Sequence, residues 1–289
     1  MPYLLALCSA FCAALGAAYQ DREITSFSDE QAKGLRLIWA SVAKPMWWLG
    51  LAVMVGSPVF QYLALRVGNL TQVQPMLTTE LLFVLGIIVV THHQRPGRLE
   101  WTGATGIVVG LALFLVAADS TGDQSVISIR WAIVMTAVAL SLVGGFYLAS
   151  RQTAAGARAA LLGAAAATCF AYQAAMTQIV AGVSITSIFT QPALLGLAIA
   201  GVSGFLFFQH ALRAGHIAAS RASMVIVDPL LSVVIGLAVF HDQIKHTPIR
   251  IVMEVVGLFV LFAGARRLAS SPLIAESGPG GPGKPAIEG

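Results

Sequence analysis

Residues 67–90 read VGNLTQVQPMLTTELLFVLGIIVV, and residues 217–240 read IAASRASMVIVDPLLSVVIGLAVF. Each stretch is long enough to span a bilayer as a helix, which takes about 20 mostly apolar residues. Each also holds a carboxylate near its middle, Glu80 in the first and Asp228 in the second. A charge at the bilayer centre costs roughly 2.5–3.5 kcal/mol. Two carboxylates at matching depths in two halves of the chain therefore indicate a functional role.

The whole chain has the composition of a membrane protein. Of its 289 residues, 57% are hydrophobic and 10% are charged, and the mean hydropathy is +0.81. Soluble domains carry about 25% charged residues. We therefore predict an all-α, polytopic membrane protein. The net charge of +4 comes from Lys and Arg in the loops, so it gives no indication of nucleic-acid binding, and the expected surroundings are the lipid bilayer.

Nine stretches are apolar enough to be membrane helices, which we number 1 to 9: residues 2–19, 46–65, 67–90, 101–118, 129–150, 159–180, 192–212, 217–240 and 249–265. Within the loop at residues 21–44, Ser28 and Gln31 have the spacing of a capping box, and the apolar residues Leu35, Ile38, Trp39 and Val42 then recur at helical spacing. This pattern predicts a short amphipathic helix on the membrane surface, with a solvated loop as the alternative. Residues 269–289 are rich in Gly, Pro and Ser, so we predict a disordered cytoplasmic tail.

The distribution of Lys and Arg predicts the orientation. Nine spans divide these residues into 13 on one side and 4 on the other. Cytoplasmic loops carry the excess of positive charge, so we expect a cell-membrane protein with its C-terminus in the cytoplasm and its N-terminus outside. If stretch 2–19 does not span, only the N-terminus changes side.

An internal repeat relates the two halves. The sequence LGLA at residues 49–52 recurs at 195–198, ALR at 64–66 recurs at 211–213, and VVGL at 108–111 recurs at 255–258, always 146–147 residues later. Helices 1–4 then match helices 6–9, with helix 5 as a linker, so residues 1–150 hold the first repeat and the linker, and residues 151–268 hold the second. Five helices separate the two starts, so the repeat is inverted, as in many secondary transporters that bind substrate near the midplane.

The third helix of each repeat is polar. Pro75 and Pro229 each lack a backbone donor, and we predict helix breaks there that line a cavity; kinked packing helices are the alternative. Arg221 either extends to the membrane surface or contacts substrate. The candidate substrate- or proton-binding residues of these two helices are Gln74, Thr78, Thr79, Glu80, Arg221 and Asp228.

Each of the remaining sequence features has two possible interpretations. Glu254 in helix 9 either faces the bundle with Asp228 or lies near the interface. Tyr172 and Gln173, midway along helix 6, either contact substrate or serve packing. The GxxxG spacing at residues 106–110 allows close helix contact, either within the repeat unit or in a homodimer.

Motifs of soluble enzymes are absent from the sequence. It has no GxxxxGK[ST] phosphate loop, no HExxH and no nucleophile elbow, which are the patterns that support nucleotide hydrolysis, zinc proteolysis and acyl transfer. We therefore expect a protein that is not an enzyme and that needs no cofactor.

The duplicated unit resembles that of the drug/metabolite transporter superfamily, in its EamA-like branch. The segments that carry this resemblance are ALRVGN at residues 64–69 and ALRAGH at residues 211–216, each followed by a polar helix with a midplane proline and then a glycine-containing helix. The resemblance covers about residues 1–268 and implies a central cavity walled by four helices of each half. Family members mostly have ten helices; with nine, the chain is similar to NIPA-type magnesium transporters.

These features predict a secondary transporter or exporter of a small organic solute that works by alternating access. Glu80 and Asp228 would couple protonation to opening or bind a cationic group. The first alternative is a divalent-cation transporter, with Glu80, Asp228 and Glu254 as ligands, because hard cations prefer several oxygen ligands. The second is a flippase for lipid-linked sugars or a non-transporting accessory subunit.

Overall fold

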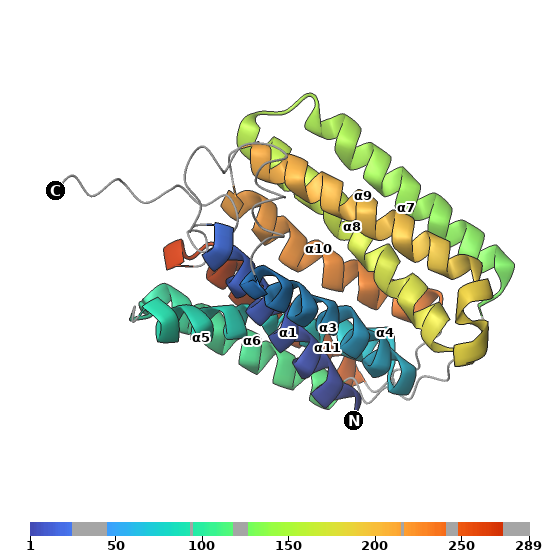
Figure 1. Ribbon diagram of the computed structural model, residues 1–289, viewed down its shortest axis with the longest axis horizontal. Helices are drawn as coiled ribbons and strands as arrows, with labels where there is room; N and C mark the ends of the chain where they lie inside the picture. The colour runs from blue at the N-terminus through green and yellow to red at the C-terminus, as the bar shows by residue number, and fades with distance from the viewer. Residues whose placement is uncertain (25–44, 93–94, 118–126, 215–216, 241–247, 274–289) are drawn as a thin grey trace.

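The computed structural model describes residues 1–24, 45–92, 95–117, 127–214, 217–240 and 248–273, and this part of the chain is helical with no strand (Figure 1). Its elements are α1 (Pro2–Ile24), α3 (Pro45–Val67), α4 (Leu70–Leu77), α5 (Glu80–His92), α6 (Arg98–Ala117), α7 (Ile129–Ser150), α8 (Ala155–Ala181), the short 3-10 helix η1 (Ile185–Thr190), α9 (Pro192–Arg213), α10 (Ile217–Ala238) and α11 (Pro248–Ala269).

The prediction of an all-α, polytopic membrane protein is confirmed. In the described residues, seven helical segments are long and apolar enough to cross a membrane, and α4 and α5 together form one of them, Leu70–Thr91. These seven occupy the third to ninth predicted stretches, while α1 and α3 occupy the first two. The predicted surface helix at residues 28–42 lies outside the described residues, as does the predicted tail from residue 274 onward. The predicted start of the disordered tail at residue 269 was wrong, because Ala269 ends α11 and Ser271 is buried.

The helices of the two halves make corresponding contacts. In the first half α1 packs on α3, α4 and α5, and in the second half α8 packs on α9 and α10. The first helices of the two halves, α1 and α8, run in opposite directions (Figure 1). The predicted inverted repeat requires this arrangement.

The two halves join most closely along α6 and α11, where glycine residues, which have no side chain, line the contact. A Cβ atom at Gly264 of α11 would lie 2.6 Å from the backbone nitrogen of Ile107, and one at Gly106 of α6 would lie 2.8 Å from the Cα atom of Gly264. Gly110 meets the backbone of Leu261 in the same way. The GxxxG spacing therefore serves contact between the halves. Both interpretations from the sequence, packing within one unit and dimer formation, were wrong for this motif.

A buried carboxylate fixes the end of this helix pair. Glu100 in the first turn of α6 accepts a hydrogen bond from the backbone N–H of Gly97 (2.8 Å) and one from the hydroxyl of Ser271, just after α11 (2.6 Å). With its side chain buried, Glu100 acts as a cap for α6 and ties the two halves together at one end of the molecule.

Candidate functional site

A helix interruption places Glu80 inside the membrane span. Between α4 and α5, the backbone N–H groups of Thr78 and Thr79 donate to the carbonyls three residues earlier, at Pro75 (3.3 Å) and Met76 (3.1 Å). The two threonine hydroxyls donate to the same carbonyls at 2.6 and 2.7 Å. A break was predicted at Pro75; it occurs three residues later, and Glu80 begins the next helix.

The threonines also have a structural role that the sequence did not predict. Thr78 and Thr79 are buried, and each hydroxyl proton is used on a carbonyl of the last turn of α4. Carbonyls at a helix end need such partners, above all where water is absent. The two hydroxyl groups stabilise the interruption and keep only their acceptor lone pairs for a ligand.

Asp228 lies on an uninterrupted helix. α10 continues through Pro229 from Ile217 to Ala238, so the predicted break at this proline was wrong. A proline removes a single backbone hydrogen bond, and in membrane helices neighbouring groups and local adjustments satisfy the freed carbonyl. The hydroxyl of Ser232, one turn further on, donates to Oδ1 of Asp228 at the long distance of 3.5 Å.

Helix packing brings the charges of the two halves together. α4 packs on α10, which is its counterpart in the second half. Glu80 interacts electrostatically with Arg221 and with Asp228, so two carboxylates and one guanidinium group share one site. All three side chains are half-buried. The interaction with Glu80 favours a role for Arg221 inside the bundle over extension to the membrane surface.

The part of α10 that carries these charges is not closely packed on any side. Every residue from 221 to 228 has intermediate exposure, although this stretch covers about two helical turns and so faces all directions. An ordinary amphipathic helix alternates buried and exposed faces. The charged residues are therefore only partly enclosed by the neighbouring helices.

Buried polar atoms without partners lie on three helices of the bundle. Among the described residues, Nε2 of Gln74 on α4, Oγ of Ser220 on α10 and Oε1 of Gln178 on α8 have no hydrogen-bond partner, and all three side chains are more than nine-tenths buried. α4, α8 and α10 pack on one another. Leaving such an atom unsatisfied costs roughly 1–3 kcal/mol. This cost favours their use as partners for a polar ligand or for ordered water.

Tyr172 and Gln173 contact other helices. The hydroxyl of Tyr172 forms a hydrogen bond with the hydroxyl of Thr136 on α7 (2.9 Å). The amide of Gln173 lies against Gly201 on α9, where a Cβ atom would be 3.3 Å from it. These contacts join α8 to its neighbours α7 and α9, which is the packing role that the sequence left open.

Glu254 lies in the protein interior, with 7% of its side chain exposed. It shares a face of α11 with Gly257 and Leu261, which contact α6. Its burial agrees with the interpretation that the side chain of Glu254 faces the bundle. Among the residues that the structure describes, no three His, Cys, Asp or Glu side chains converge as a metal site would require. The predicted ligand set of Glu80, Asp228 and Glu254 was thus wrong.

Comparison with known proteins identifies a relative whose function is uncharacterized. An uncharacterized protein from Corynebacterium glutamicum is 26% identical over 248 residues, which cover 84% of this chain and 85% of the relative. No family model matches the chain, and no solved structure matches it.

Two buried polar residues without partners were not singled out from the sequence. Gln178 is a polar residue in an otherwise apolar helix, and this signal was available. Ser220 gave no such signal, because a serine in a membrane helix commonly bonds to the preceding turn of its own helix. Only the structure shows that this hydroxyl is fully buried and has no partner in the described part of the chain.

Proposed function

We propose that the protein is a secondary transporter for a small organic solute, working by alternating access in the cell membrane. The observation that carries this proposal is the shared site of Glu80 and Asp228, one from each half, together with Arg221. Ionisable groups inside a membrane are costly and are typical of substrate and proton pathways. The resemblance to the drug/metabolite transporter superfamily supports the same conclusion.

The arrangement of charges suggests how coupling works. Two carboxylates and one guanidinium group leave an excess negative charge when all three are ionised. Electrostatic interactions are strong where water is scarce, so a proton or a cationic group of the solute stabilises the site with both halves in contact. Loss of that positive charge restores repulsion between Glu80 and Asp228. The halves then favour a different relative position, which is the step that an alternating-access carrier needs.

Transport by purified protein tests this proposal. Proteoliposomes that contain a pH-sensitive dye are exposed to a panel of amino acids, amines and organic acids, and solute-dependent proton movement is recorded. We expect Asp228→Asn and Glu80→Gln each to abolish this movement while the protein still melts cooperatively. Glu100→Gln is the matched control, because it neutralises a buried carboxylate outside the site. Full proton-coupled transport by the Asp228→Asn, Glu80→Gln double variant would refute the proposal.

A further inference from the structure

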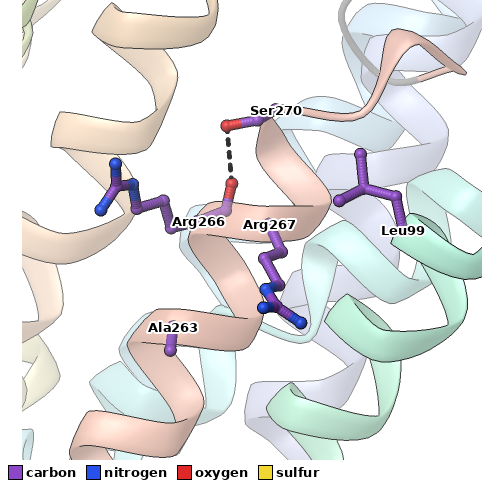
Figure 2. Close-up of a pocket in the computed structure, with 5 residues that line it drawn as sticks. All are labelled: Leu99, Ala263, Arg266, Arg267 and Ser270. Carbon is purple, nitrogen blue, oxygen red and sulfur yellow. Dashed lines mark hydrogen bonds between the residues drawn. The ribbon is translucent and has the colours of Figure 1, made fainter.

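A groove with two arginines lies where α6 begins and α11 ends. It has a volume of about 330 Å³ and is lined by Leu99, Ala263, Arg266, Arg267 and Ser270. Figure 2 shows the two guanidinium groups on either side of the last turns of α11. The hydroxyl of Ser270 donates to the carbonyl of Arg266 (2.8 Å). The groove thus combines two cations with an apolar floor.

The cations of this groove are available to a ligand. Arg266 and Arg267 are exposed, and neither has an acidic partner in the described part of the chain. The nearby carboxylate of Glu100 is buried and accepts hydrogen bonds from Gly97 and Ser271. Both arginines also lie in the last turn of α11, so their side chains leave the membrane span at its edge, at the level of lipid headgroups.

An apolar stripe continues from the groove along the same face of α11. Val252, Val256, Phe259 and Ala263 follow one another at helical spacing, and the three larger side chains are 61%, 46% and 74% exposed. Eleven residues of helix span about 16 Å, which is half of the roughly 30 Å hydrocarbon thickness. One face of α11 is therefore apolar over the depth of one leaflet and ends in two positive charges.

We propose that this groove binds an anionic phospholipid, with the phosphate-containing headgroup bound by Arg266 and Arg267 and an acyl chain along the apolar stripe. A basic pocket between membrane helices at the membrane surface is the kind of site that anionic headgroups select. The close contact of α6 with α11 at Gly103 and Gly264 keeps the two walls of the groove in fixed positions. The site is separate from Glu80 and Asp228 and does not depend on the proposed transport.

Native mass spectrometry of the delipidated full-length protein tests the lipid site. Phosphatidylglycerol and phosphatidylcholine with identical acyl chains are titrated separately, and the expected result is one phosphatidylglycerol bound in clear preference to phosphatidylcholine. Arg266→Gln together with Arg267→Gln should weaken phosphatidylglycerol binding by roughly 25-fold, because each arginine near an anionic surface contributes roughly a fivefold factor. Arg151→Gln together with Arg158→Gln is the matched control, since both residues are exposed arginines outside the groove.

A second variant tests the apolar part of the site. Ala263→Trp fills the groove and leaves both arginines in place, so it should also weaken binding of phosphatidylglycerol, and thermal melting identifies any variant that is misfolded. Equal loss in the Arg151, Arg158 control would show that overall charge is responsible and would overturn the proposal. Unchanged binding in the Arg266, Arg267 variant would overturn it too, as would equal affinity for glycerol phosphate without acyl chains or a dimer that covers this face.

Discussion

The interaction between Glu80 and Arg221 links two residues that are remote in sequence. Removing one of two opposite charges that interact inside a protein leaves the other charge less compensated. We therefore expect Arg221→Gln to destabilise the wild type more than it destabilises the Glu80→Gln variant. The difference, measured by reversible unfolding in mixed micelles, should be about 0.5–3 kcal/mol, the usual coupling between interacting residues.

An exposed arginine provides the comparison for this double-mutant cycle. Arg151 lies in the turn between α7 and α8, and its side chain is exposed. Arg151→Gln should have the same effect with and without Glu80→Gln, since distant sites are additive within a few tenths of a kcal/mol. Additive effects for Glu80 and Arg221 as well would show that these two residues do not interact.

The sequence identifies single residues of the site but not their partners. Glu80 and Asp228 are recognisable because a carboxylate in an apolar stretch has few explanations. The partner of Arg221 cannot be derived in the same way, because spacing within one helix relates Arg221 only to Asp228. Its interaction with Glu80 depends on the packing of α4 on α10. Unpartnered atoms such as Nε2 of Gln74 likewise become visible only when all neighbours are placed.

The close packing of helix α6 against helix α11 depends on glycine. Gly264 meets the backbone nitrogen of Ile107 so closely that an added methyl group requires the helices to separate. Overpacking of this kind typically costs about 1–3 kcal/mol. Gly264→Ala should therefore lower the melting temperature of the purified protein in detergent, even though alanine is the better helix former.

Gly145 on α7 is the control for this substitution. It also lies within a membrane helix, but a Cβ atom there would meet nothing within 4 Å. Gly145→Ala should leave the melting temperature unchanged or raise it, because alanine favours the helix by up to about 1 kcal/mol. If Gly264→Ala melts at the wild-type temperature, the close approach of α6 and α11 described above is incorrect.

The positions of helix interruptions were predicted less well than the positions of the helices. The apolar pattern locates α4, α5 and α10 well, since long apolar segments give the strongest signal. Two prolines, however, had different outcomes: α10 continues through Pro229, whereas the span that contains Pro75 breaks at Thr78 and Thr79. The hydroxyls of the two threonines donate to the carbonyls of Pro75 and Met76, so local side-chain hydrogen bonds stabilise the break where it occurs.

Charge is distributed unequally between the two ends of the whole molecule. The junctions of α5 with α6 and of α7 with α8, and the end of α11, lie at one end of the bundle (Figure 1). That end carries the described arginines Arg95, Arg98, Arg151, Arg158, Arg266 and Arg267, whereas Arg66, Arg130 and Arg250 belong to the opposite end. This asymmetry agrees in direction with the count made over the whole sequence, and it predicts that the first end faces the cytoplasm.

Cysteine labelling in cells tests this orientation. In a background where Cys8, Cys12 and Cys169 are replaced by alanine, Gln152→Cys and Ser184→Cys place one exposed thiol at each end. A membrane-impermeant maleimide should label Ser184→Cys in intact cells, and Gln152→Cys only after permeabilisation, because the bilayer separates the two positions. Labelling of both variants after permeabilisation controls for reactivity. The reverse pattern would place the arginine-rich end outside, and the positive-inside distribution would then not determine how this chain inserts.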